Sequence, residues 1–223
     1  MIRTVAAIAL CSAAAGAQSL SDVPTQWDLA LGNGTGATSI SAGASRATYL
    51  GTSDKLRAGF GLRATFVTGT MTLDPKDPRG IGAHDDQLET PTGSLLLNVG
   101  VHLGYEVSRK VMVGMNLDFF GLTLGAQQDA DLTPEGGGTV EKVRVKPSTP
   151  NIFAGGSGDR GSLNSEFFLS WALNDKYAVR GGLSHTLVGV QLTDDQTGTG
   201  GSSTKYNKYA NMVFLGLRIT PPQ

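Results

Sequence analysis

The sequence predicts an all-β protein, an eight-stranded antiparallel transmembrane β-barrel with short periplasmic turns and long extracellular loops. Three observations predict this fold class. Apolar residues alternate with small or polar ones over segments of ten or more residues, whereas strands of soluble proteins usually have about five or six and a tilted strand needs about 9 to 11 to cross a bilayer. Short and long connections alternate between these segments. Glycine accounts for 31 of the 223 residues, about twice its usual share of roughly 7%, without the Gly-X-Y period of collagen.

The N-terminal segment predicts export. Arg3 supplies a positive charge, residues 5–16 are apolar or small, and Ala15-Gly16-Ala17 offers small residues where a signal peptidase cuts. The apolar run is too short for a membrane anchor, which needs about 20 residues. We therefore expect residues 1–17 to be a signal peptide and residues 18–223 to be the barrel domain of a bacterial envelope protein.

The eight strands are predicted from the alternation. The clearest segment places apolar side chains at every even position from Leu56 to Phe66, with Arg57, Gly59, Gly61, Arg63 and Thr65 between them. In the fifth segment, Phe119 is expected on the apolar face and Phe120 on the other. Residues 37–50 alternate poorly, so whether they form a full membrane-spanning strand stays open. The predicted strands cover residues 25–33, 37–50, 55–70, 94–107, 111–124, 163–174, 177–191 and 207–219.

The connections alternate in length. Residues 52–54, 108–110 and 175–176 are tight turns. Three polar segments, predicted to be long loops, separate the other strands: residues 71–93, 125–162 and 192–206. This arrangement is typical of outer-membrane barrels, with the turns in the periplasm and the loops outside.

The composition of the two faces indicates which one meets lipid. The non-apolar face is rich in glycine and carries a few charges, which suits the narrow interior of an eight-stranded barrel better than a water-facing surface. Aromatic side chains on the apolar face cluster near the predicted periplasmic ends and predict an interfacial girdle there. This predicted girdle comprises Trp27, Tyr105, Trp171 and Tyr177, while Tyr209 and Phe66 are expected at the outer rim.

This architecture resembles the small eight-stranded outer-membrane barrels of the OmpA, OmpX and OmpW group. The resemblance covers the whole mature chain and rests on strand pattern and connection lengths rather than on a diagnostic motif. Such barrels usually end in an aromatic residue, whereas this chain ends in Leu217-Arg218-Ile219 followed by residues 220–223. The resemblance implies a cleaved exported protein in the bacterial outer membrane.

Strand parity predicts an inward-facing set of balanced charges. Opposite charges at common heights imply ion pairs, because an unpaired charge in a low-dielectric interior is strongly destabilising. A plugged lumen is the main interpretation, and a gated pore or small-ligand pocket in which Arg63 rearranges is the alternative. The predicted lumen network comprises Asp28, Glu106, Asp118 and Glu166 against Arg57, Arg63, Arg180 and Arg218.

The sequence offers little catalytic or metal-binding chemistry. Ser184 and His185 are adjacent on a strand, so they point to opposite faces and cannot act as nucleophile and base. The acidic groups at residues 84–86, 129–131 and 194–195 lack the spacing of a calcium loop and are interpreted as solvated loop residues. We expect no cofactor, no metal site and no catalytic residue.

Charge and cysteine content exclude two further classes. Eighteen basic and nineteen acidic residues give a net charge of −1, which provides no field for nucleic acid. The only cysteine, Cys11, lies in the predicted signal peptide, so disulfides are excluded.

The leading functional prediction is a structural or surface-interaction role carried by the extracellular loops, above all residues 125–162. The alternatives are a narrow pore or transporter for a small or apolar solute, and a lipid-modifying enzyme. Residues 139–146 alternate so that Lys142, Arg144 and Lys146 share one face, which predicts a strand extension above the membrane. This segment is either a simple soluble ribbon or a surface whose cations meet lipopolysaccharide phosphates. The other expected partners are the lipid bilayer and an unidentified extracellular molecule. The chain is expected to be a monomer.

Overall fold

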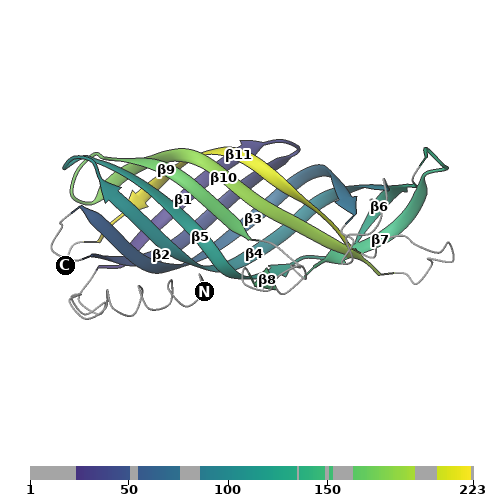
Figure 1. The fold of residues 1–223 in the computed structure, drawn as a ribbon, viewed down its shortest axis with the longest axis horizontal. Coiled ribbons are helices and arrows are strands. Elements are labelled where there is room, and N and C mark those ends of the chain that lie inside the picture. The colour runs from purple at the N-terminus through teal and green to yellow at the C-terminus, as the bar shows by residue number, and fades with distance from the viewer. Residues whose placement is uncertain are drawn as a thin grey trace, which may run out of the picture.

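A closed ring of eight antiparallel strands forms the body of the protein (Figure 1). The computed structural model describes residues 24–50, 55–75, 86–134, 136–148, 151–152, 163–193 and 205–221. The predicted signal peptide, the 52–54 turn, His84, Asp85, Asp194 and Asp195 lie outside these residues. Strand β1 pairs with β11 and closes the ring, which confirms the predicted fold class. The ring strands are β1 (Gln26–Gly34), β2 (Ala37–Tyr49), β3 (Leu56–Pro75), β4 (Gln87–Glu106), β5 (Val111–Leu124), β9 (Asn164–Ala172), β10 (Tyr177–Leu192) and β11 (Lys205–Ile219).

Strand β2 answers the question left open for residues 37–50. All thirteen of its residues pair with β3, and its first nine also pair with β1. The small side chains that weaken its alternation therefore do not prevent a full strand. Thr35 and Gly36 form a two-residue turn before it, and Gly36 adopts a φ of 68°, which glycine tolerates without a Cβ clash.

The register sets the tilt of the strands. Following paired residues from Leu56 of β3 once around the ring leads back to β3 at Phe66, ten residues further along. For eight strands this stagger corresponds to a tilt of about 40° from the barrel axis. Ten residues at that tilt rise about 25 Å, the height of the apolar band of a transmembrane barrel.

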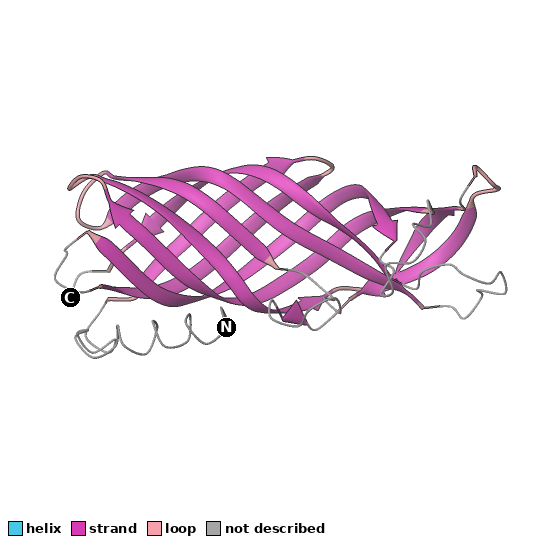
Figure 2. Cartoon of the chain, in the orientation of Figure 1, coloured by secondary structure: helices cyan, strands magenta, loops and turns pink. Residues whose placement is uncertain are grey.

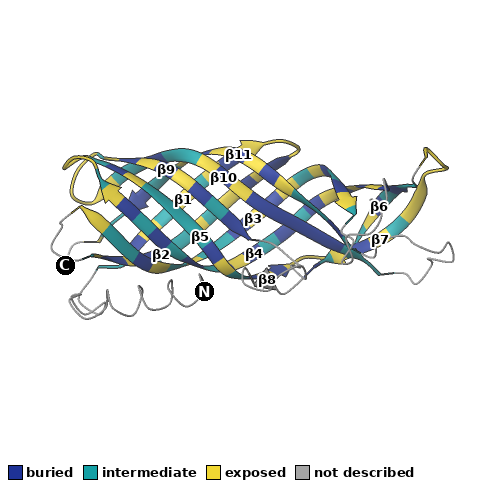
Figure 3. Ribbon diagram, in the orientation of Figure 1, coloured by how far each residue is buried: buried dark blue, intermediate teal, exposed yellow. Residues whose placement is uncertain are grey.

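The outer wall carries that apolar band. Leu56, Phe60, Leu62 and Phe66 of β3 are all exposed, and the next outward residue, Thr68, is polar. Alternating exposed and buried residues run around the whole ring (Figure 3). A water-soluble barrel would bury these side chains, so the protein is a transmembrane β-barrel whose band ends near Thr68.

The described part of the chain contains no helix long and apolar enough to cross a membrane.

Four ring strands continue beyond the band and form a second ring. Strand β6 (Gln128–Thr133) pairs with β4, and β7 (Glu141–Pro147) pairs with both β6 and β10. The far ends of β3 and β11 pair with each other above the short β1–β2 hairpin. The upper ring therefore runs β3, β4, β6, β7, β10, β11, and the β6–β7 hairpin projects from the barrel (Figure 2).

This second ring corrects the predicted loops. Residues 71–75, 87–93, 128–133 and 141–147 belong to strands, as does the pair β8 (Asn151–Ile152), which contacts β5. The loop prediction was wrong for residues 71–75, 87–93, 128–133 and 151–152 because polar composition was equated with irregular structure. The strand extension predicted at residues 139–146 is confirmed by β7 from Glu141 onward. Above the membrane a strand exposes its polar face to water, so polar residues are expected in it.

A β-bulge in β5 reverses the predicted orientation of one side chain, that of Phe120. Val99 of β4 pairs with Phe120, whereas Gly100 pairs with Asp118, so Phe119 has no partner of its own. Phe120 consequently shares the outward face of Val99 instead of pointing inward as predicted. Strict alternation cannot foresee a bulge, which inserts one residue and shifts the parity of everything after it.

The polarity of the interior changes with height. Arg63 of β3 lies inside the apolar band, whereas Val67, Met71 and Leu73 follow it upward into a buried apolar core. That core lies inside the upper ring, and its outward positions are polar, as in a soluble barrel. Its buried members are Ala37, Val67, Met71, Leu73, Leu88, Leu96, Ala130, Leu132, Val145, Val188, Val190, Tyr206, Ala210 and Met212.

Candidate functional site

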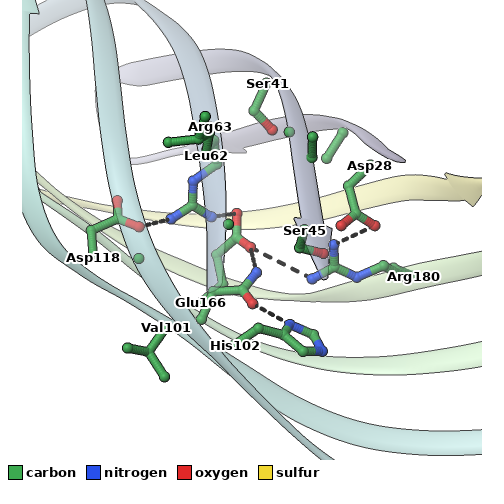
Figure 4. A pocket seen from close by; sticks show the side chains of 16 residues that line it. Asp28, Ser41, Ser45, Leu62, Arg63, Val101, His102, Asp118, Glu166 and Arg180 are labelled. Atoms are coloured by element: carbon green, nitrogen blue, oxygen red, sulfur yellow. Dashed lines mark hydrogen bonds and ion pairs between the residues drawn. The ribbon is translucent and has the colours of Figure 1, made fainter. Parts of the chain in front are cut away.

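The structure places the eight predicted inward charges in the lower lumen, and Figure 4 shows five of them, namely Asp28, Arg63, Asp118, Glu166 and Arg180. The inward positions of β1, β3, β4, β5, β9, β10 and β11 supply them, because successive side chains on a strand alternate between the lumen and the lipid. Each of the eight takes part in at least one ion pair. Two linked groups and one separate pair result.

The upper group is centred on Arg63. Its guanidinium nitrogens lie 2.6 Å from Asp118 Oδ1 and 2.7 Å from Glu166 Oε1. Asp118 also accepts hydrogen bonds from the Asn98 amide and from the backbone N–H of Asn164, the latter at 3.0 Å. Both carboxylates are almost fully buried. Each charge of the group is therefore paired within the protein, as a buried network requires, while Arg63 Nε has no hydrogen-bond partner among the described residues.

The lower group is centred on Asp28. Its carboxylate lies 2.8 Å from Arg180 Nη1 and accepts bonds from Arg218 Nε at 2.9 Å and Nη2 at 3.2 Å. Arg180 continues to Glu166 at 3.6 Å and links the two groups. Its guanidinium also lies 3.9 Å from the ring centroid of Phe168, a cation–π contact.

The third pair lies at the end of the barrel where residues 108–110 and 174–176 connect strands, called here the turn end. Arg57 Nη1 lies 3.5 Å from Glu106 Oε1. The Tyr49 hydroxyl donates to the same carboxylate oxygen at 2.7 Å. This pair is more exposed than the two linked groups.

Sequence reasoning missed the neutral side chains that complete the network. Asn116 donates to Glu166 Oε2 at 2.7 Å, and its amide oxygen lies 2.7 Å from His102 Nδ1. Asn98 and Asn164 contact Asp118 as described above. Their inward parity was readable, and an amide at an inward position beside predicted charges is the signal that could have found them. Phe168 gave no such signal.

A small cavity remains beside the network. It has a volume of about 50 Å³ and lies between Arg63, Arg180 and a wall of small residues that includes Gly43, Gly61 and Ser41. A space of this size holds a few water molecules and no larger solute. The lumen is thus filled by side chains within the membrane band and by the apolar core above it.

The four predicted girdle residues lie on the outer wall near the turn end. Trp27 and Tyr177 both pair with Ile219, the last residue of β11. Trp171 pairs with Val111 at the start of β5, and Tyr105 lies on β4 next to the 108–110 turn. All four predicted residues are exposed.

The Ser184 and His185 side chains lie on opposite sides of the wall. Ser184 is buried in the lumen and its hydroxyl donates to Asn164 Oδ1 at 2.8 Å. His185 is exposed, stacks on Tyr209 with centroids 4.0 Å apart, and has Nδ1 2.5 Å from Asn211 Oδ1. These two residues therefore cannot form a nucleophile–base pair.

The β6–β7 hairpin carries its charges on its outer face. Lys142 contacts Asp131, and Arg144 Nε lies 3.8 Å from Asp129 Oδ1. Lys146 is exposed on the same face of β7. The predicted basic stripe is thus partly neutralised by the facing strand. Among the residues that the structure describes, no group of three metal-ligating side chains converges.

Comparisons with known proteins show weak likenesses to solved structures. No protein-family model matches the chain, and no curated protein matches it in sequence. Among solved structures, it is similar to the neisserial surface protein NspA at 14% identity and a TM-score of 0.41, covering 88% of this chain and 96% of that one. A major outer membrane protein of Thermus thermophilus gives 14% identity and 0.40, covering 87% and 98%. The outer membrane protease OmpT of Escherichia coli gives 10% and 0.42, covering 83% and 64%.

All three likenesses have TM-scores below 0.5, so neither the fold nor the function is inferred from them. The strand pairing and the exposed apolar band show that the chain is a small transmembrane β-barrel.

Proposed function

We propose that this chain is an outer-membrane barrel with a closed lumen and that it acts through contacts at the end where the β6–β7 hairpin projects. The observation that carries the proposal is the double closure of the interior. Ion pairs fill the lumen inside the apolar band, and the apolar core fills it above the band. A structural or surface-interaction role follows, because solutes have no open path and the projecting hairpin is the part displayed to other molecules.

The orientation of the barrel across the outer membrane is part of the same proposal. The tight turns are assigned to the periplasm and the hairpin end to the cell exterior, as in barrels of this architecture. An even number of strands puts the start of β1 and the end of β11 on the same side of the membrane. In this orientation that side is the periplasm.

Single-channel recording in a planar bilayer tests the closure. The wild-type barrel is expected to be silent. Arg63→Ala is expected to be silent as well, because it opens only the ion-paired layer and leaves the apolar core of the upper ring. Steady current steps in the wild type, altered by Arg63→Ala, would overturn the proposal in favour of a gated pore.

The surface role is tested on the hairpin itself. A variant with Lys142, Arg144 and Lys146 changed to glutamine removes the outward cations while leaving the inward Val143 and Val145 in place. We propose that this variant loses binding to lipopolysaccharide or to host cells, with its barrel intact by the gel shift between boiled and unboiled samples. Unchanged binding would exclude the basic stripe as the contact surface.

A further inference from the structure

The turn end of the lumen opens into a second and larger cavity. It has a volume of about 230 Å³ and is bounded by the ends of β3, β4, β5, β9, β10 and β11 and by the turns at residues 108–110 and 174–176. We call this cavity the vestibule. Its lining contains five basic and two acidic residues, namely Arg57, Arg109, Lys110, Lys176 and Arg218 against Glu106 and Asp175.

The vestibule has a closed floor. Met112 lines it and packs with Phe168 and Phe214 in a separate apolar cluster. Arg180 lies against the rings of Phe168 and Phe214, with the two linked ion-pair groups beyond it. A solute that enters from the turn end therefore meets a dead end, so the vestibule suits binding and not transit.

Arg218, which lines the vestibule, has a buried hydrogen-bond donor without an acceptor in the part of the chain that the structure describes. Its side chain is only 5% exposed, and its Nε and Nη2 atoms both bind Asp28. The guanidinium is planar, so Nη1 points away from that carboxylate. Nη1 is buried and has no hydrogen-bond partner among the described residues. Arg218 lines the vestibule and not the small cavity beside the ion network, so a ligand in the vestibule would lie beside this guanidinium.

Arg57 repeats this pattern on the opposite side. Its Nη1 faces Glu106 and its Nη2 donates to the Ala47 carbonyl at 3.4 Å, while its buried Nε has no partner in the described part of the chain. Buried donors without partners are rare, because each forfeits its hydrogen bond with water. Arg63 and Arg180 also have nitrogens without a hydrogen-bond partner among the described residues, but they line the cavity of about 50 Å³, whereas Arg57 and Arg218 line the larger vestibule together with three further cations. This concentration of cationic donors around one cavity points to an oxyanion as its ligand.

We propose that the vestibule binds a phosphate group. Guanidinium donors fix the orientation of such a group, and the turn cations Arg109, Lys110 and Lys176 attract it as point charges. The group is carried either by a free phosphate compound or by an anionic phospholipid headgroup from the adjacent leaflet. This site lies at the opposite end from the hairpin, so it does not depend on the proposed surface role.

Titration with inorganic phosphate tests the site. The barrel is refolded in a phosphate-free amine-oxide detergent, and binding is followed by calorimetry and by the arginine Nε–H resonances in nitrogen-15 NMR spectra. One saturable site is expected, with shifts at Arg57 and Arg218. The double variant Lys110→Gln/Lys176→Gln is expected to weaken binding about tenfold, and Arg218→Lys, which keeps the charge but removes the fork, is expected to weaken it further.

The matched control changes two lysines at the other end of the barrel. Lys142→Gln/Lys146→Gln removes the same charge and is expected to leave phosphate affinity unchanged. Absence of saturation, or equal affinity in both double variants, would overturn the proposal even if Arg218→Lys failed to fold. Transfer to nanodiscs with phosphatidylglycerol separates the two sources, because loss of the phosphate response identifies a lipid headgroup and its retention identifies a free phosphate compound.

Discussion

Replacing Arg63 by methionine tests whether the ion network stabilises the barrel. The substitution keeps much of the side-chain volume but leaves two buried carboxylates without their cation. Asp118 and Glu166 are only 3% and 6% exposed at the side chain, and Arg63 is 11% exposed. Removing one partner of a buried ion pair typically lowers stability by about 3–5 kcal/mol.

The remaining contacts place the expected loss at the lower end of that range. Asp118 keeps two hydrogen bonds, from Asn98 and from the Asn164 backbone. Glu166 keeps Asn116 at 2.7 Å and Arg180 at 3.6 Å. We therefore expect Arg63→Met to lower the free energy of unfolding by about 3 kcal/mol.

The assay is reversible urea unfolding in a bilayer or micelle, followed by tryptophan fluorescence. Trp27 and Trp171 both lie on the exposed outer wall, so their emission reports loss of the lipid contact. Arg144→Met is the control, because that pair is 3.8 Å long and its side chains are 64% and 83% exposed. Its expected effect is below about 1 kcal/mol.

A compensating variant sharpens the test. Neutralising one carboxylate together with the arginine, as Arg63→Met/Asp118→Asn, is expected to recover most of the lost stability, because Arg180 and Arg218 then balance Asp28 and Glu166 and no uncompensated charge remains. A loss below about 1 kcal/mol for Arg63→Met alone would refute the network as a stabilising element. If the double variant does not recover stability, the shape of these side chains and not their charge is what stabilises the lumen.

Three further substitutions probe the band, the upper core and the interior space. Val101→Arg, in the middle of the outward face of β4, is expected to lower the free energy of unfolding in a bilayer by about 2–4 kcal/mol, whereas Thr70→Arg above the band is expected to lower it by about 0–1 kcal/mol. Equal effects would show that the apolar band is wrongly positioned. Leu96→Ala in the upper core is expected to lose about 2–5 kcal/mol in urea unfolding, and Leu62→Ala on the lipid face clearly less. Gly114→Leu is expected to abolish the folded gel band, because even a Cβ there would lie 2.4 Å from a ring carbon of Phe168 on the neighbouring strand β9 and 2.7 Å from the Leu103 backbone oxygen; a normally folded variant would contradict that packing.

The sequence was sufficient to predict the ring because lipid and lumen impose opposite demands on neighbouring residues. From Leu56 to Phe66 the apolar and small residues alternate without a break, so both the strand and its lipid face could be assigned. Charge parity likewise identified which acids and arginines face inward. The specific pairs could not be predicted, because the stagger that brings Arg63 of β3 opposite Glu166 of β9 emerges only when the ring closes.

Apart from β7, which the alternation of residues 139–146 indicated, the upper ring could not be predicted from the same reasoning. Thr68, Thr70 and Thr72 continue the alternation of β3 with polar outward residues, which in isolation is indistinguishable from a polar loop. Their strand character depends on β11 and on the distant β6–β7 hairpin, which cover Met71 and Leu73 from the other side. Pairing between segments so far apart in sequence leaves no local signal.

Different interactions fill the two halves of the interior, because the outer face of the barrel contacts lipid in one half and water in the other. Within the band the apolar side chains of the outer face contact lipid, so the barrel does not need an apolar core there. The narrow lumen can therefore hold charged side chains, provided that they form ion pairs. Above the band the outer face meets water, so burial of apolar side chains inside the upper ring becomes the main source of stability.

The β1–β2 hairpin ends at Gly36, near the top of the band, and β5 and β9 also end or begin there, so β6 and β7 are needed to complete the upper ring. The projecting hairpin is therefore part of the closure of the barrel as well as the surface it displays. A partner that binds the hairpin by its outer charges can do so without disturbing Val145, Ala130 or Leu132, which hold the inner side of the ring together.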